Sequence, residues 1–306
     1  MIRSLLFAAS IACAAFDAAA QTRKVGTIFE ATGERGTAYI AASAHANSHV
    51  RLELNATAVG ALEKSDVIGF EQLPDSPIER SPRAGVNAMI SRPAGSSLKD
   101  DLPDDLALRL ESQLKQLGAP PGAWEMLVTR KTQYAATLLS EMSAVHGRST
   151  RGKVYPSLDD TYRKAAESRS IRATDIEGSL RAYGSLLDVT TDESIAAIRL
   201  FAEEMDKPDH QGISDTRLGV VLDAVYAGDL ARVREIIEAN ACMTPLLASR
   251  CRKISDARNP FMAEQIDLLV KRGQHPFVAI GALHLTGPNS VLAELERKGY
   301  KVRRLQ

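Results

Sequence analysis

A short apolar segment near the C-terminus ends abruptly on a histidine. Residues 277–283 are apolar apart from one glycine, and His284 follows them shortly before a Gly-Pro pair. A run of this length bounded by turn residues is typical of a buried strand. Residues 37–44, near the other end of the chain, run into His45 in the same way. Both ends of the chain therefore predict strands that deliver a polar side chain where they finish.

The pattern between these two segments predicts a second strand and then a long series of helices. Residues 66–70 form another apolar strand, and a helix that carries Val59 and Leu62 precedes it. Periodic apolar positions and capping residues predict helices over residues 104–117, 124–142, 157–167, 179–188, 191–206, 214–227, 230–239 and 258–272. An extended segment at 170–176, a helix with Pro288 in its first turn and a last strand at 300–305 complete the prediction.

The predicted fold class is α/β. A central sheet, mostly parallel or mixed, is formed by the N- and C-terminal segments, and a large, mostly helical layer is inserted at about 104–240. Residues 74–103 hold prolines at positions 74, 77, 82, 93 and 103. This proline density predicts a surface loop or a decorated insertion, with a lid over a site as the alternative.

The balance of charge excludes some classes of partner. Lysine plus arginine and aspartate plus glutamate each number 38, so the chain has no basic excess for nucleic acid or anionic lipid. With 44% apolar residues, the 306-residue chain supports a buried core. We therefore expect one domain over residues 21–306 and no nucleic-acid partner.

The first 20 residues have the pattern of a secretory signal peptide. Arg3 supplies a positive start, residues 5–16 are mostly apolar, and three alanines end at Ala20. Cleavage after Ala20 predicts a periplasmic or secreted protein, and the poor match around Cys13 disfavours a lipoprotein. The apolar run is too short to span a bilayer and no later stretch is long enough, so we expect no integral membrane span.

Export changes how the cysteines are interpreted. Removal of the signal peptide leaves Cys242 and Cys251 in an oxidising compartment, and we predict that they form a disulfide. The alternative is two separate buried thiols, because nine positions along a continuous helix hold the sulfurs too far apart to join. The disulfide therefore requires a bend, which Pro245 permits.

Four polar side chains follow predicted strands: His45, Glu71, Glu177 and His284. Ligands collect beyond the carboxyl ends of parallel strands, where side chains leave the packed core. Two imidazoles and a carboxylate are suitable ligands for zinc, manganese or cobalt and leave a position open for water. By spacing alone, structural histidines and solvated carboxylates are the alternative, and the compact H-E-x-x-H pattern is absent.

Several motifs together resemble those of a known family. They are GALHLTG at 281–287 followed by Leu295, Gly299-Tyr300 and Val302; DARNPFMA at 256–263; AGDL at 227–230; DIE at 175–177; and VIGFE at 67–71. Over roughly residues 37–306 the chain resembles the TraB/GumN (PrgY-like) family. That family is related to Tiki-type metal-dependent proteases and, more distantly, to erythromycin esterase-like and ChaN-like proteins, all built on two G-x-x-H segments plus carboxylates.

The resemblance implies a role for each candidate residue. His45, Glu71 and His284 would bind a divalent metal ion, with manganese, cobalt or zinc as the candidates. Glu177 would be a further ligand or the general base. Arg258 would clamp an anionic group or stabilise developing negative charge, as a fixed guanidinium does.

The first motif departs from the family pattern. It reads ASAH, with Ala42 where the family has glycine. If that glycine lets backbone approach the metal or a neighbouring strand, the methyl group of Ala42 narrows the site. His49 lies four residues beyond His45, but in a loop this spacing has no helical meaning, so we do not expect it to be a ligand.

The resemblance implies an exported metal-dependent hydrolase of peptide or ester bonds, with a peptide or other small envelope molecule as substrate. The first alternative is a non-catalytic periplasmic binding protein for peptide signals or exopolysaccharide, which suits the family's associations with pheromone shutdown and exopolysaccharide gene clusters. A haem or iron-handling role through the ChaN-like relatives is the second. The chain has no P-loop, dinucleotide fingerprint or G-x-S-x-G elbow, which argues against nucleotide chemistry and a serine hydrolase.

Overall fold

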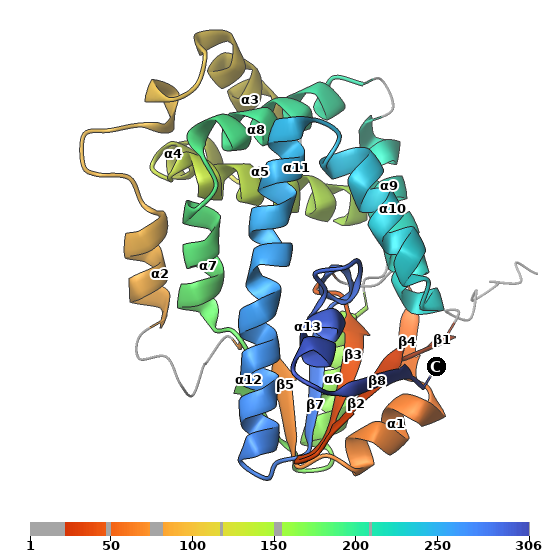
Figure 1. Cartoon of the computed structure of the whole chain (residues 1–306). Helices are drawn as coiled ribbons and strands as arrows, with labels where there is room; N and C mark the ends of the chain where they lie inside the picture. The colour runs from red at the N-terminus through yellow and green to blue at the C-terminus, as the bar shows by residue number, and fades with distance from the viewer. Residues whose placement is uncertain are drawn as a thin grey trace, which may run out of the picture.

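The computed structural model of the 306-residue chain describes residues 22–46, 50–73, 82–116, 119–149, 155–207 and 210–305. The predicted signal peptide and His49 lie outside these ranges. Figure 1 shows the arrangement of the described elements, with a sheet in the lower half and helices above it.

The described strands form a six-stranded mixed sheet. Its order is β6 (Arg172–Asp175), β5 (Val67–Phe70), β7 (Pro276–Gly281), β3 (Gly36–Ser43), β2 (Ile28–Gly33) and β8 (Lys301–Arg304). The first four are parallel neighbours, whereas β2 pairs antiparallel with both β3 and β8. This confirms the predicted sheet built from both ends of the chain, with β6 added from within the helical middle.

A second, two-stranded parallel sheet lies beside the main one. It pairs β1 (Thr22–Val25) with β4 (Arg51–Leu54). These strands have no clear signal in the sequence, because both are short and carry charged residues, so neither forms an apolar run.

Helices cover both faces of the main sheet. In Figure 1, α12 (Asn259–Lys271) and α13 (Val291–Arg297) lie in front of it and α6 (Leu158–Glu167) lies behind. Met262 and Ile266 of α12 are fully buried in the sheet core. On α6, the ring of Tyr162 packs against that of Phe277 in β7, with 5.3 Å between centroids. Burial on both faces explains why β7 reads as a continuous apolar run.

A second hydrophobic core holds part of the helical layer together, whereas Leu222 and Val233, from two later helices of that layer, are buried in the core of the sheet. The fully buried residues of the second core include Leu110, Leu139 and Ile198, which come from three different helices. The layer comprises α3 (Asp104–Gln116), α4 (Ala123–Val128), α5 (Thr132–Ser149), α7 (Ser179–Leu187), α8 (Thr191–Met205), α9 (His210–Ala227), α10 (Leu230–Ala241) and α11 (Pro245–Ile254). These helices stand beyond the sheet edge at which the parallel strands finish (Figure 1).

One predicted helix is in fact two. The prediction of a single helix over 124–142 was wrong, because α4 ends at Val128 and α5 begins at Thr132. The intervening residues pair with a distant segment instead: the N–H of Arg92 donates to the carbonyl of Thr129 at 2.9 Å, and that of Lys131 to the carbonyl of Ile90 at 2.8 Å. A long-range backbone contact thus replaces the helical hydrogen bonds.

The proline-rich region is not simply a loop. Its described part contains α2 (Pro82–Ile90) and the short 3-10 helix η1 (Leu98–Asp100). Pro82 occupies the first position of α2, where its missing N–H is not needed. Ser97 and Asp100 form a capping box at the start of η1. The prolines therefore mark helix starts as well as breaks.

The last helix begins later than predicted. Pro288 lies in the turn before α13 rather than in its first turn, because Ser290 is the N-cap and accepts a hydrogen bond from the N–H of Ala293 at 3.2 Å. A serine hydroxyl satisfies a free N–H at a helix start, which proline cannot do.

The predicted disulfide is confirmed. Cys242 directly follows α10 and Cys251 lies in α11, with Cα atoms 6.1 Å apart. The required bend is present: Thr244 caps α11 and Pro245 is its first residue.

The length and polarity of the helices also bear on membrane insertion. None of the helices in the described ranges is long and apolar enough to cross a bilayer.

Candidate functional site

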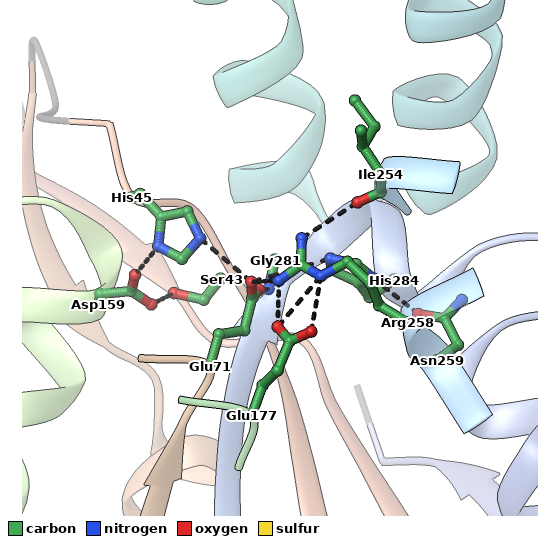
Figure 2. Close-up of polar contacts among 10 residues, drawn as sticks. All are labelled: Ser43, His45, Glu71, Asp159, Glu177, Ile254, Arg258, Asn259, Gly281 and His284. Carbon is green, nitrogen blue, oxygen red and sulfur yellow. Dashed lines mark hydrogen bonds and ion pairs between the residues drawn. The ribbon is translucent and has the colours of Figure 1, made fainter. Parts of the chain in front are cut away.

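The four polar residues predicted at strand ends come together at one edge of the sheet. Glu71 directly follows β5, His45 lies two residues beyond β3 and Glu177 two residues beyond β6. The predicted strand 277–283 stops at Gly281, and His284 lies on the 3-10 helix η3 (Ala282–Leu285) that follows. Because β6, β5, β7 and β3 are parallel neighbours, these side chains share the same end of the sheet (Figure 2).

The Glu71 carboxylate lies between the two histidines. Its Oε2 atom is 3.6 Å from Nε2 of His45 and 3.8 Å from Nε2 of His284. Its Oε1 atom accepts the backbone N–H of Gly281 at 2.5 Å. Glu71 is only 3% exposed, whereas the side chain of His45 is 64% exposed. The site therefore opens to solvent on the His45 side.

His284 is oriented by a buried amide. Its Nδ1 lies 2.6 Å from Oδ1 of Asn259, and the Nδ2 of Asn259 donates to the carbonyl of Asn289 at 2.6 Å. Since the amide donates through Nδ2, Oδ1 is the acceptor and Nδ1 of His284 carries the hydrogen. The lone pair of the neutral imidazole is then on Nε2, which faces Glu71.

His45 is oriented by a carboxylate. Its Nδ1 hydrogen-bonds to Asp159 at the start of α6, and the hydroxyl of Ser43 donates to the same carboxylate (Figure 2). Nε2 of His45 again faces Glu71. Both imidazoles thus use Nδ1 for anchoring and present Nε2 inward, which is the usual arrangement of histidines that ligate a metal.

Arg258 joins the two glutamates. Its Nε donates to Glu177 at 2.9 and 3.1 Å, its Nη2 contacts both carboxylates, with 3.2 Å to Glu71 Oε2, and its Nη1 donates to the carbonyl of Ile254 at 3.1 Å. The carboxylate end of Glu177 is fully enclosed. In this arrangement the guanidinium holds both carboxylates in place, and the side chain of Glu177 has no solvent contact.

Electrostatics favour positive charge between the histidines. Burial alone raises the pKa of the Glu71 carboxyl, but the charges of His284, His45 and Arg258 outweigh it, and that pKa falls well below its usual range. Hydrogen bonds to Asp159 and then to Glu71 raise the pKa of His45. Burial lowers the pKa of His284 and favours its neutral form, although the Glu71 charge acts in the opposite direction.

Two of the donor separations at the site suit a divalent ion. Among the described residues no three His, Cys, Asp or Glu side chains stand as a ready-made ligand set. A tetrahedral ion with bonds of about 2.1 Å would nevertheless separate its ligand atoms by about 3.4 Å, close to the 3.6 and 3.8 Å between Glu71 and the two imidazoles. An ion held there would require that Glu71 Oε2 be released from, or shared with, Arg258.

The alanine in the first motif does not narrow the site. Ala42 is 1% exposed, belongs to the hydrophobic core of the sheet and pairs with Ile280. The glycine that matters is Gly281 in the second motif, where a Cβ atom would lie 3.0 Å from Glu71 Oε1. In the strand register Gly281 is opposite Ser43, so the two motifs are not equivalent positions of the sheet.

Sequence reasoning missed two residues of the site. Asn259 belongs to the DARNPFMA motif at 256–263, which resembles the family's sequence. The motif pointed to this residue, but its role in orienting His284 was not predicted. Asp159 has no comparable signal, because it occurs among helix-starting residues and looks like an ordinary first-turn acidic residue. Only the packing of α6 beside β3 brings it to His45.

Fold and site together define an α/β protein with a histidine and carboxylate centre beyond four parallel strands. Over residues 27–304 the chain matches the TraB/PrgY/gumN family, nearly its whole length, and it belongs to that family. No curated protein and no solved structure matches it.

Proposed function

We propose that this protein is an exported metal-dependent hydrolase that acts on peptide or ester bonds. The observation that carries the proposal is the convergence of two Nε2 atoms on one carboxylate oxygen, Glu71 Oε2, at 3.6 and 3.8 Å. The two buried carboxylates Glu71 and Glu177 share the single positive charge of Arg258, and burying charge is costly unless it is paired, so a further cation at the imidazoles would be stabilising.

His45, His284 and Glu71 would hold the ion. When bound, it would lower the pKa of a water molecule and polarise the substrate carbonyl. Asp159 and Asn259 keep the imidazoles aimed at that position. Nitrogen and carboxylate ligands suit zinc, manganese or cobalt.

Arg258 and Glu177 would act as a pair. The guanidinium is fixed by Glu177 and reaches Glu71, so it is placed to stabilise negative charge that develops at the site. Glu177 is enclosed and already bonded, which favours its role as the partner of Arg258 over that of general base.

A non-catalytic binding protein is the second candidate. It is favoured by the engagement of Arg258 with two carboxylates and by the lack of a free, solvent-accessible base in the described part of the site. Such a protein would bind a peptide signal or an exopolysaccharide and release it unchanged.

The first experiment is elemental analysis of protein purified without chelator. We expect close to one divalent ion per chain, lost in His45→Ala and in His284→Ala. His275→Ala is the control, because that histidine is exposed and, among the described residues, its side chain pairs only with Asp66. Full retention of metal in both site variants would refute the metal centre.

A second experiment separates the two candidates. The metal-loaded protein is incubated with a peptide library, and products are followed by mass spectrometry beside His284→Ala. New termini that appear only with the unmodified site indicate a hydrolase. Peptide retention without any cleavage product would instead indicate the binding protein.

Export is tested separately. We expect the mature chain to start at Gln21, which N-terminal sequencing of the protein from an envelope fraction would check. A chain that retains Met1 in the cytoplasmic fraction would contradict it.

A further inference from the structure

A cleft of about 460 Å³ opens between α10, α11 and the turn after β7, away from the groups described above. Its walls include Ser255 and Leu283, which come from the segments that carry Arg258 and His284. Asn289 also lines it, and the carbonyl of this residue holds the Asn259 amide. The cleft thus borders the segments that position the site without including any of its ligands.

Part of the cleft is apolar. Ile237 of α10, Ala248 of α11, Leu283 and Pro288 line it, together with the disulfide between Cys242 and Cys251. The disulfide joins the two helices that form opposite walls, so the spacing of the cleft is fixed covalently. These residues form a wall on which an aliphatic side chain can pack.

The polar part contains an arginine with unused donors. Arg252 is exposed and lines the cleft, and no hydrogen bond or ion pair joins it to any residue in the described ranges. Arg234, the other arginine in the lining, is engaged: its Nε bonds to Glu238 at 2.7 Å, and its Nη1 bonds to the carbonyl of Thr286 at 3.1 Å and lies 4.0 Å from Asp256. Glu238 and Asp256, the two carboxylates in the lining, are thus both paired with Arg234. The two arginines therefore differ in their capacity to take a ligand.

A buried hydroxyl adds to this unused capacity. Ser255 is 4% exposed, and its Oγ has no hydrogen-bond partner among the described residues. Buried polar atoms in native proteins are nearly always paired. Because the unpaired hydroxyl of Ser255 lies in the lining of an open cleft, we infer that a polar group of a bound molecule, or a water that this molecule holds, forms the missing hydrogen bond.

We propose that this cleft binds a carboxylate attached to an apolar side chain, as in the C-terminal residue of a peptide. The guanidinium of Arg252 is the group that recognises a carboxylate best, through two parallel hydrogen bonds. The apolar wall takes the side chain, which a free inorganic anion would leave uncovered. The cleft needs no metal ion, so this binding is independent of the proposed hydrolase activity.

The probes are N-acetyl-L-leucine, its amide and acetate, titrated by calorimetry into the full mature protein. We expect the acid to bind at one site per chain. The amide should bind about tenfold more weakly, because a hydrogen-bonded charge contributes roughly 1.5 kcal/mol or more. Acetate, which lacks the apolar group, should also be weaker.

Variants assign the binding to the cleft. Arg252→Gln should weaken the acid about tenfold while leaving the amide unchanged. Arg232→Gln is the matched control, since Arg232 is an exposed arginine of α10 that pairs with Glu235 and does not line the cleft. His45→Ala should bind the acid normally, which separates this result from the fate of the metal centre.

Three results would overturn the proposal. They are equal affinity for acid and amide, equal affinity in the Arg252 and Arg232 variants, and no saturable heat of binding at millimolar ligand. Comparable binding of acetate would show that the site takes any small anion, which also contradicts the proposed ligand class.

Discussion

A glycine and an alanine at matching positions of the two motifs have opposite importance. Gly281 lets the Glu71 carboxylate approach the backbone and accept its N–H at 2.5 Å. Ala42, where the family has glycine, fills the sheet core instead. The effect of an alanine at either position therefore depends on which atoms surround its Cβ atom. The motif alone does not reveal those atoms.

We expect Gly281→Ala to impair metal binding. The new Cβ atom would lie 3.0 Å from Glu71 Oε1, and moving that carboxylate would cost roughly tenfold or more in affinity, as disturbed support of a metal ligand does. Ala42→Gly should keep the metal and lose about 1 kcal/mol of unfolding free energy, through greater backbone freedom. Metal titration and urea unfolding of both variants check this, and normal metal affinity in Gly281→Ala would contradict it.

Asn259 acts through His284. Asn259→Ala removes the acceptor of the Nδ1 hydrogen and should weaken metal binding about 10- to 100-fold, because loss of such outer partners has that effect. Asn240→Ala is the control: its side chain donates to the carbonyl of Ile236 on α10 and does not contact the site. A competition assay with a metal-binding dye measures both. Equal affinities would show that Asn259 does not orient the imidazole.

At the scale of an element, α3 shows why a helix could be predicted from the periodicity of its apolar residues. Its buried residues include Leu106, Leu110 and Leu114, which recur every four positions on one face. Asp104 and Asp105 occupy its first turn, where negative charge is favoured. Both signals are local, so the sequence predicted this helix closely.

The two faces of α3 should respond differently to truncation. Leu110 is fully buried in the helical core and Leu108 is 71% exposed. Leu110→Ala should lower the unfolding free energy by about 2–5 kcal/mol through the cavity it leaves, and Leu108→Ala by less than about 0.5 kcal/mol. Urea unfolding measures both. Metal content of the folded Leu110 variant should stay normal, since α3 does not reach the site.

At the scale of the whole molecule, a partly buried ion pair ties two helices of the upper layer. Glu193 at the start of α8 accepts two hydrogen bonds from Lys253 of α11, at 2.9 and 2.8 Å. The carbonyl of Ile254, the next residue, accepts a hydrogen bond from Arg258. The pair thus lies one residue along the chain from a backbone contact of Arg258.

This pair predicts how stability depends on pH. Burial raises the pKa of Glu193, but hydrogen bonds, chiefly from Lys253, outweigh it and lower the pKa from 4.5 to about 2. A carboxyl with a depressed folded-state pKa stabilises the protein above its unfolded value and loses that effect as pH falls. Unfolding free energy should therefore decline from about pH 5 towards pH 2.

Glu193→Gln tests this dependence. At pH 7 it should destabilise the protein by about 1–3 kcal/mol, because it removes charged hydrogen bonds, and the decline below pH 5 should be shallower. Glu111→Gln is the control, since Glu111 forms an exposed pair with Lys115. Urea unfolding across this pH range is the measurement. Parallel pH profiles in the two variants would contradict the role of Glu193.

The sequence by itself determined the fold class, the strands that end near the site and the family. Each of these is written in local patterns: apolar runs of strand length, helical periodicity, caps and contiguous motifs. It also predicted that His45, Glu71, Glu177 and His284 follow strands, and the parallel pairing of those strands made them neighbours.

Only the tertiary structure decided what surrounds these residues. Asp159 reaches His45 because α6 packs beside β3, and residues 129–131 leave their helix because they pair with a segment some 40 positions earlier. Tertiary contacts also bring two glutamates to Arg258 and surround Ala42 with the apolar core of the sheet. Such contacts join parts of the chain that are far apart in sequence, so no local pattern encodes them.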